Sequence, residues 1–263
     1  MFYREFPPPA ALKDHIQCFW ALEHDYRDAS HNHEHLWADT HIELIFSYGQ
    51  PYYRSGGIVL PQNFIIGPFK KELLLYSDGL TGFVAVRFHP WGFAAFSTKK
   101  MADLINKILP VGEVLDGGPL LRGSVSTGEV PARLDLLASW FCRQLADQPG
   151  ESLAVQPIAE AIRAKKGIAK ITDLTKEFSI NPCKLERLFI KSTGMSAKMY
   201  ARILRFNHAK QLIELNPEIS LASLTYETGY ADQAHFSNNF REMFGYTPAR
   251  FKSLMKEKMR LES

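Results

Sequence analysis

Two segments in the C-terminal half carry the same ordered pattern of apolar residues, glycines and helix-capping residues. Five positions of the first segment recur 51 positions later in the second. The five pairs are Leu185 and Phe236, Phe189 and Phe240, Gly194 and Gly245, Ser196 and Thr247, and Tyr200 and Phe251. Upstream the displacement is 50, as in the pairs Leu174 and Leu224, and Ile180 and Tyr230. Because two copies cannot build a solenoid, the repeat predicts a pair of similar units, the second with a turn one residue longer.

The second copy, residues 220–252, predicts two short helices around a glycine-centred turn. Gly229 supplies the left-handed backbone conformation that a tight exit requires, and Asp232 can cap the second helix. That helix has a strong helical period, with apolar residues at Phe236, Phe240, Met243 and Phe244. Gly245 ends it. This order of helix, turn and helix is the shape of a helix-turn-helix unit.

One long helix is predicted between the two copies. Ser196 can cap its start, and Asn216-Pro217 stops it. Its apolar stripe consists of Met199, Tyr200, Ile203, Leu204, Leu212 and Ile213. The two helix-turn-helix units are expected at about 171–192 and 221–244, and Thr247 with Pro248 begins a further helix after the second.

The second copy resembles the C-terminal signature of the AraC/XylS family of transcription regulators. The elements that carry the resemblance are Gly229-Tyr230, Asp232, the run from Phe236 to Phe240, and Gly245-Tyr246-Thr247-Pro248. The family's usual linker-helix spacing is matched by Tyr200, Arg205, Ala209 and Leu212. Asn238 stands where the family usually has arginine, which affects one phosphate or base contact and not the fold. The resemblance implies a sequence-specific DNA-binding regulator with two reading units.

Polar side chains beside the apolar stripe of each recognition helix are the candidate DNA contacts. They are Lys184, Arg187 and Lys191 in the first helix, beside Cys183 and Glu186, and Gln233, His235, Ser237, Asn238 and Arg241 in the second. Arg187 suits guanine, and Gln233 or Asn238 suits adenine, because their donors and acceptors match those base edges. Lys191 and Arg241 are expected to touch phosphate. The long helix should hold the units in successive major grooves roughly 34 Å apart, so that one chain reads two boxes about ten base pairs apart.

Charge is divided unequally along the chain. Residues 155–263 hold 18 Lys and Arg against 11 Asp and Glu, a net charge of +7, whereas residues 1–154 have a net charge of −4. This asymmetry suits attraction to phosphate by one part only. Three scattered cysteines fit neither a disulfide framework nor a Cys-x-x-Cys zinc site, and neither a signal peptide nor a membrane span is recognisable. These features predict a cytoplasmic protein.

The first half of the chain predicts short strands. The segment 41–48, HIELIFSY, alternates with period two and places Ile42, Leu44, Phe46 and Tyr48 on one face. Further strands are predicted at 56–68, 72–76 and 82–89. Short helices are predicted at 91–96 and at 101–109, with Thr98 as a cap of the second. Strands at this spacing indicate a small barrel or sandwich.

Three pieces of this half, IELIFSYGQPY, FIIGPF and VRFHPWGF, resemble an N-terminal sensor domain found in some AraC-type regulators. That domain is commonly taken as a divergent cupin-like barrel, and the resemblance covers roughly residues 6–115. The predicted fold class is therefore α+β. A β-rich, cupin-like barrel or sandwich precedes an all-α domain in which a long helix joins two helix-turn-helix units.

Three parts are predicted: a sensor domain at 1–115, a connecting region at 116–152 and a DNA-binding domain at 153–263. The connecting region contains a predicted helix at 132–148 and a predicted hinge at 149–152. The apolar stripe of the helix consists of Leu134, Leu137, Phe141 and Leu145. This stripe either packs on the protein's own barrel or pairs with a second subunit, and periodicity does not separate the two. We expect a dimer.

Alternating histidines form a candidate metal site. Three of them would share one face of a strand, where imidazoles bind zinc or nickel: His31, His33 and His35. Asp39 follows at a spacing loosely like that of a cupin carboxylate ligand, but Arg27 stands where a cupin has glycine. The alternative is an exposed polar loop, because Asn32 and Glu34 make both faces polar.

Two pairs of polar residues form a candidate effector site. His41 and Glu43 lie two residues apart on one predicted strand, and Arg87 and His89 lie two apart on another. If their faces meet inside the barrel, Arg87 would bind an anionic or hydroxylated effector. The alternative is a structural ion pair.

Catalytic motifs are not recognisable: the chain has no Ser-His-Asp order, phosphate-binding glycine loop or Cys-dependent alkyl-transfer site. No enzymatic activity and no cofactor are therefore predicted. We expect a one-component transcription regulator that binds double-stranded DNA and a small-molecule effector, with RNA polymerase as a further candidate partner and no membrane. The alternatives are a cupin-type metalloenzyme or metal sensor fused to a DNA-binding domain, and a double helix-turn-helix that serves protein contact alone.

Overall fold

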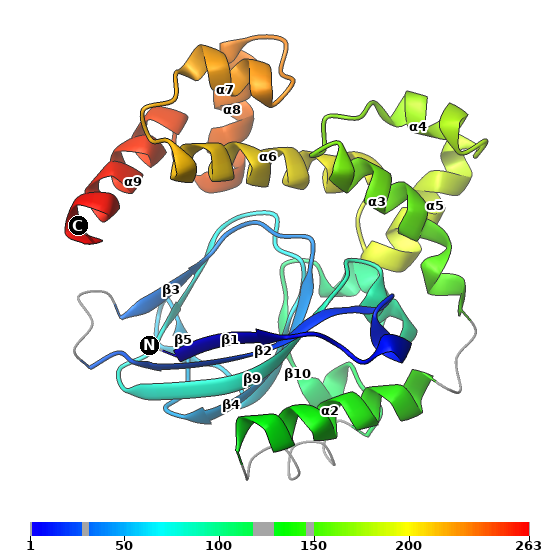
Figure 1. Cartoon of the computed structure of the whole chain (residues 1–263), viewed down its shortest axis with the longest axis vertical. Coiled ribbons are helices and arrows are strands. Elements are labelled where there is room, and N and C mark those ends of the chain that lie inside the picture. Colours follow the sequence, from blue (N-terminus) through cyan, green and yellow to red (C-terminus); the bar gives the residue numbers. More distant parts are fainter. Residues whose placement is uncertain (1, 28–31, 118–128, 146–149, 263) are drawn as a thin grey trace.

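The computed structural model describes residues 2–27, 32–117, 129–145 and 150–262. A β-rich N-terminal part lies below, and the helices of the C-terminal part lie across its top (Figure 1). This arrangement confirms the predicted α+β class. None of the helices in the described ranges is long and apolar enough to cross a membrane.

Two sheets form the N-terminal part. The larger has the strand order β1 (Phe2–Phe6), β2 (Ile16–Asp25), β9 (Leu80–Phe88), β4 (Ile42–Gly49), β7 (Asn63–Ile66) and β10 (Ile108–Pro110). The smaller has the order β3 (His33–Leu36), β8 (Leu73–Tyr76), β5 (Tyr53–Arg54) and β6 (Ile58–Val59). The paired strands within both sheets run antiparallel. The predicted strands at 41–48, 72–76 and 82–89 correspond to β4, β8 and β9, and the segment 56–68 contains β6 and β7.

Both faces of the larger sheet are covered. Ile42, Leu44 and Phe46 pack with the buried stripe of helix α2 (Val130–Leu145). The opposite face, which includes Ile45, packs in a second cluster with Leu73 and Leu75 of the smaller sheet. The stripe of α2 therefore packs on the protein's own sheet, which is the first of the two alternatives that its periodicity left open.

Two predicted helices are wrong. Residues 91–96 form only the 3₁₀ turn η2 (Gly92–Ala95), and residues 101–109 divide into η3 (Met101–Leu104) and strand β10. Asn106 adopts a positive φ of 56°, which breaks the helical path, and the residues after it pair with β7 at the sheet edge. Thr98 is not a cap, because the residue at the N-cap of η3 is Lys100, which makes no capping hydrogen bond.

Seven α-helices lie within the described residues 150–262. They are α3 (Gln156–Ala164), α4 (Ile171–Glu177), α5 (Pro182–Thr193), α6 (Ala197–Leu215), α7 (Leu221–Glu227), α8 (Gln233–Phe244) and α9 (Pro248–Glu262). The predicted caps of two of them are confirmed, since Asp232 Oδ1 accepts from the His235 N–H at 2.7 Å and Ser196 Oγ from the Met199 N–H at 3.0 Å. Helix α6 joins the unit α4–α5 to the unit α7–α8, as predicted (Figure 1).

The two parts of the chain share a packed interface. The Trp37 ring, which follows β3, lies 4.6 Å from the Phe244 ring and 5.3 Å from the Phe251 ring, between centroids. Ala38 and Trp91 belong to the same buried cluster as the helices. At the end of α5, a Cβ added to Gly194 would lie 2.4 Å from the Met101 carbonyl oxygen, so the two backbones are in direct contact. The N-terminal part therefore supports both helix-turn-helix units.

Candidate functional site

Helix α5 presents its charged side chains to solvent. Asn181 caps the helix by accepting from the Cys183 N–H at 2.8 Å, and Pro182 occupies its first turn. Lys184, Arg187 and Lys191 are exposed, whereas Leu185 and Phe189 are buried in the cluster below. Within the described residues, the Arg187 side chain makes no ion pair or hydrogen bond, so its paired donors are available to a ligand.

Helix α8 repeats this arrangement in the second unit. The exposed candidates are Gln233, His235, Asn238 and Arg241, and Ser237 is half-buried. The His235 ring packs edge-on against Tyr230, with centroids 5.1 Å apart, so it has a defined orientation at the start of the helix. Phe236 and Phe240 face the core. Both recognition helices therefore place the predicted DNA-contacting residues at or near the surface.

Contacts around α6 fix the two units to each other. Arg205 of α6 donates to the Gly167 carbonyl from Nε and Nη2, at 3.2 and 2.9 Å, and its guanidinium lies 5.2 Å from the centre of the Tyr230 ring. Arg202 of α6 donates to both carboxylate oxygens of Glu242 in α8. One helix thus binds the loop before the first unit and the turn and recognition helix of the second, which favours a fixed spacing between the units.

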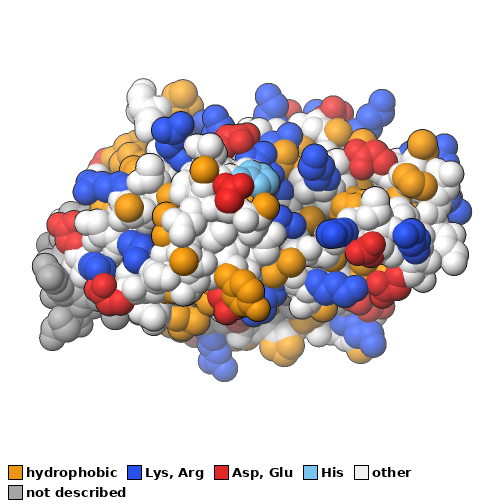
Figure 2. Space-filling view, turned by 90° about the horizontal axis from the view of Figure 1, so that it is seen from above, with side chains coloured by type: hydrophobic (Ala, Val, Ile, Leu, Met, Phe, Trp, Pro, Cys, Tyr) orange, Lys and Arg blue, Asp and Glu red, His pale blue; other side chains and the backbone are white. Residues whose placement is uncertain are grey.

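Positive side chains are spread along the length of the helical face in the view from above, with acidic residues among them (Figure 2). The C-terminal excess of lysine and arginine in the sequence therefore appears at the surface. A distributed excess of this kind attracts a polyanion along its length.

A cavity of about 290 Å³ lies between the sheets and helix α6. Three of the four predicted effector residues line it: His41, Glu43 and Arg87. Glu43 and Arg87 meet there because they are directly paired across β4 and β9. Its other walls include Trp20, Trp37 and Asp39 from the N-terminal part and Asn207 and Lys210 from α6. The cavity therefore belongs to both parts of the chain.

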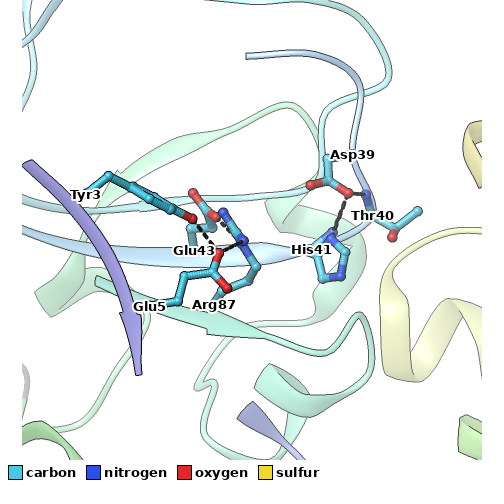
Figure 3. Close-up of polar contacts among 7 residues, drawn as sticks. All are labelled: Tyr3, Glu5, Asp39, Thr40, His41, Glu43 and Arg87. Atoms are coloured by element: carbon cyan, nitrogen blue, oxygen red, sulfur yellow. Dashed lines mark hydrogen bonds and ion pairs between the residues drawn. The ribbon is translucent and has the colours of Figure 1, made fainter. Parts of the chain in front are cut away.

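The polar residues in and beside this cavity form two separate hydrogen-bonded groups, one around Arg87 and one around Asp39 (Figure 3). Arg87 donates from Nε to Glu43 at 2.7 Å and from Nη1 to Glu5 at 3.2 Å. Asp39 Oδ1 lies 2.8 Å from His41 Nδ1 and accepts from the Thr40 N–H at 2.6 Å. The structural ion pair, the alternative that the sequence left open, is thus present in the structure.

Burial raises the pKa of Glu43, and the nearby Arg87 guanidinium opposes that shift. For Asp39, burial acts to raise the pKa, but the charge and hydrogen bond of His41 and two backbone N–H groups outweigh it and lower the pKa to about 2. The lining includes two basic side chains, Arg87 and Lys210, and two acidic ones, Asp39 and Glu43. Each basic side chain already has an acidic partner, since Arg87 binds Glu43 and Lys210 binds Glu214 at 2.9 Å. A neutral, hydroxylated ligand therefore fits this lining better than an anion does.

His89 does not line this cavity, unlike the other three predicted effector residues. It follows the end of β9, where its Nε2 lies 3.1 Å from the Lys13 carbonyl oxygen and its ring stacks on Trp91. Residues two apart share a face only within a strand, and β9 ends at Phe88. His89 therefore does not share a face with Arg87.

The predicted metal site gains no support from the described residues. His31 lies outside them. The His33 ring packs near Tyr76, whereas His35 stacks on Trp37 and its Nε2 lies 2.7 Å from Glu72 Oε2. No three His, Cys, Asp or Glu side chains in the described ranges are grouped to hold a metal ion. The two histidines thus have separate structural partners.

Several residues of the cavity could not be found from the sequence. Trp20 and Trp37 carry no polar pattern, and Lys210 lies on a helix whose apolar stripe indicates only packing. They meet the strand residues through the interface between the two parts of the chain. Trp20 Nε1 is buried and, among the described residues, has no hydrogen-bond partner. An unpaired donor beside a cavity points to a ligand, and the structure reveals it where the sequence does not.

Each of the two parts of the chain matches a known domain family. Residues 4–110 match the family described as a domain of unknown function, DUF6597, and residues 174–253 match a helix-turn-helix domain family. The Msm operon regulatory protein of Streptococcus mutans is 29% identical over 37% of this chain and 35% of its own length. The HTH-type transcriptional regulator GlxA of Rhizobium meliloti is 34% identical over 29% of this chain and 24% of its own.

A solved structure of ToxT from Vibrio cholerae covers 89% of this chain and 98% of its own, at 12% identity and a TM-score of 0.45. The chain spans only about a third or less of the length of the two curated relatives above. Those matches cover no more than 99 residues of this chain. The C-terminal residues 174–253 thus form a helix-turn-helix domain of the AraC type, which follows an N-terminal DUF6597 domain.

Proposed function

We propose that this protein is a sequence-specific DNA-binding transcription regulator that acts by binding and not by catalysis. The observation that carries the proposal is the pair of capped recognition helices, α5 and α8, held by one helix with their polar residues outward. Arg187 is assigned to guanine, Gln233 or Asn238 to adenine, and Lys191 and Arg241 to the phosphates, with Lys184 as a further DNA contact. His235 and Ser237 are assigned to contacts at the edge of the groove. Genomic DNA as the target places the protein in the cytoplasm.

The test of this function is the spacing of the two boxes. Because α6 holds the units rigidly, inserting about five base pairs between the boxes turns one box to the opposite face of the duplex. The affinity of the full chain should then fall by about a hundredfold, since only one unit can bind at a time. Fluorescence anisotropy with a duplex selected from a random pool measures the loss.

The same insertion placed outside the boxes is the control, and it should leave the affinity unchanged. Equal affinity for the inserted and the original duplex would contradict the two-headed reading of DNA. A complete absence of DNA binding would instead support the use of the two units for protein contact alone.

We further infer that the cavity between the sheets and α6 takes the effector, and that the effector is a neutral, hydroxylated molecule. Its balanced charge, its two tryptophans and the unpaired Trp20 Nε1 donor support that chemistry. A ligand that binds only the folded protein raises the melting temperature by mass action. A panel of monosaccharides and polyols should therefore contain members that raise the melting temperature of the full chain more than the corresponding sugar acids do.

Trp20→Phe removes the donor and keeps most of the ring, so it should reduce this shift. Trp140→Phe is the matched control, because Trp140 packs beside Phe141 of α2, away from the cavity. Differential scanning fluorimetry gives the comparison. An unchanged shift in Trp20→Phe, or no shift with any neutral member, would exclude this assignment.

Two further partners stay proposals. Contact with RNA polymerase is expected of a regulator bound beside a promoter. A homodimer would have to use residues other than the buried stripe of α2, such as Leu136, which is 44% exposed. A single monomeric mass in sedimentation, with and without DNA, would exclude the dimer.

A further inference from the structure

A basic groove lies between the N-terminal part and the first recognition helix. Its volume is about 1080 Å³, and its walls are Ala94 and residues 98–102 on one side and the outer face of α5 on the other. The charged side chains of the groove are Lys99, Lys100, Glu186, Arg187 and Lys191. Four basic residues and one acidic residue thus line the groove, together with apolar residues such as Met101 and Ile190.

The two neighbouring lysines of the N-terminal wall, Lys99 and Lys100, lie in a part of the chain that is acidic overall. Residues 1–154 have a net charge of −4, so neighbouring lysines on this wall do not follow from a basic domain. They face a helix wall that is itself basic. Positive groups on both sides of one space attract an anion that enters it, because both walls then act on the same negative charge. The charge distribution therefore points to a polyanion in the groove.

The lysine wall has a fixed position relative to α5. The contact between Gly194 and the Met101 carbonyl holds the end of α5 against η3. The segment before η3 is held by the Thr98 N–H, which donates to the Val114 carbonyl at 3.0 Å, and by the Lys99 N–H, which donates to Ser97 Oγ at 3.0 Å. Lys99 Nζ lies 3.9 Å from Glu113, a loose ion pair that leaves the amine near the groove.

A recognition helix in the major groove, which is about 12 Å wide, has a phosphate strand on each side. A wall that faces α5 across a groove therefore lies where one of these strands must pass. We propose that Lys99 and Lys100 bind DNA phosphates beside the first box, so that the N-terminal domain forms part of the DNA interface. This inference rests on the proposed function of α5, and it assigns a nucleic-acid contact to the domain of unknown function.

The test uses the full chain and a duplex about 30 base pairs long that carries both boxes. Lys99→Ala with Lys100→Ala should weaken binding roughly tenfold at physiological salt. It should also reduce the slope of log K against log salt by about 1.8, because each phosphate contact contributes about 0.9. A duplex of random sequence should show the same reduction in slope, since phosphate contacts carry no sequence information.

Lys13→Ala with Lys107→Ala is the matched control, because it removes two exposed lysines of the same domain that do not line the groove. It should leave the affinity and the slope within error of the wild type. Arg187→Ala is the reference for the recognition helix and should weaken specific binding.

The outcomes separate the inference from the function on which it rests. If Arg187→Ala weakens binding while the Lys99 and Lys100 double variant behaves like the control, the lysine contact is wrong and the DNA-binding function stands. If the double variant binds DNA more tightly, residues 98–102 block the duplex and the inference is also wrong. If neither variant changes binding, the lysine contact and the proposed role of α5 in DNA recognition are both wrong.

Discussion

Replacing Arg87 by alanine is expected to lower the free energy of unfolding by about 3 kcal/mol at neutral pH. Arg87 is 23% exposed and Glu43 14% exposed at the side chain, and Arg87 binds Glu43 and Glu5 together. Its loss leaves the Glu43 carboxylate largely buried without its cation. Breaking a buried pair from one side is costly because the remaining charge has neither water nor a partner. Urea unfolding of the full chain measures the change.

The defect should depend on pH with a defined sign. Burial already raises the pKa of Glu43, and without Arg87 the pKa rises further. A carboxyl group whose pKa is higher in the folded state favours folding when it is protonated, so the variant should recover stability as the pH falls from 7 toward 5. The double variant Arg87→Ala with Glu43→Gln should regain most of the lost stability and lose this pH dependence.

A surface ion pair gives the control for this experiment. Lys165 and Glu177 lie 3.1 Å apart with half-exposed side chains, so Lys165→Ala should cost less than about 1 kcal/mol. A loss of the same small size for Arg87→Ala would show that the pair in the cavity is solvated and contributes little. In that case Arg87 would be free to act as an anion ligand, contrary to the neutral effector proposed here.

The helix-turn-helix units were predictable because their signals are local. A cap such as Asp232 and a glycine such as Gly229, which has a φ of 65°, act on backbone groups within a few residues, so the sequence contains them directly. The repeat supplied a second, independent check. At the position equivalent to Gly229, the first unit has Ser179 with a φ of 48°, so the left-handed conformation is kept even where the glycine is not.

The N-terminal site was only partly predictable because its contacts are non-local. Strand alternation placed Glu43 and Arg87 on faces that could meet, and their pairing across β4 and β9 confirms that they do. The same alternation failed for His89, which lies past the strand end. The helical pattern at 101–109 also failed, because the last of these residues pair with β7 instead. Lys210 and Lys99 acquire their surroundings only when the two parts of the chain pack together.

The shared interface connects the cavity to the reading units. Trp37 lines the cavity and also packs against Phe244 at the end of α8, while Lys210 belongs to the helix that sets the spacing of both units. A ligand bound in the cavity would therefore contact Trp37, a side chain that also packs against the second unit. Through this shared side chain, the proposed effector could influence the position of α8 and so the binding of DNA.

The largest single effect is expected from Gly167→Ala, which should lower the free energy of unfolding by about 4 kcal/mol. Gly167 has a φ of 75°, which costs an alanine about 1 kcal/mol. An added Cβ would also lie 2.1 Å from the Ala201 carbonyl oxygen and 2.6 Å from the Arg205 N, both backbone atoms of α6. Helix α6 would have to move away, and the Arg205 hydrogen bonds to the Gly167 carbonyl would be lost.

Gly56→Ala measures the free-energy cost of a positive φ alone, without the steric clash that an alanine meets at Gly167. Gly56 has a φ of 85°, but an added Cβ meets nothing within 4 Å, so this variant should lose only about 1 kcal/mol. The difference between the two glycines in urea unfolding measures how tightly the loop before the first unit is held to α6. Because Arg205 also packs on Tyr230 of the second unit, Gly167→Ala should weaken binding to the two-box duplex while binding to a single box falls less. Equal stability losses at the two glycines would show that α6 yields at this contact, and the rigid spacing between the reading units would then have no structural basis there.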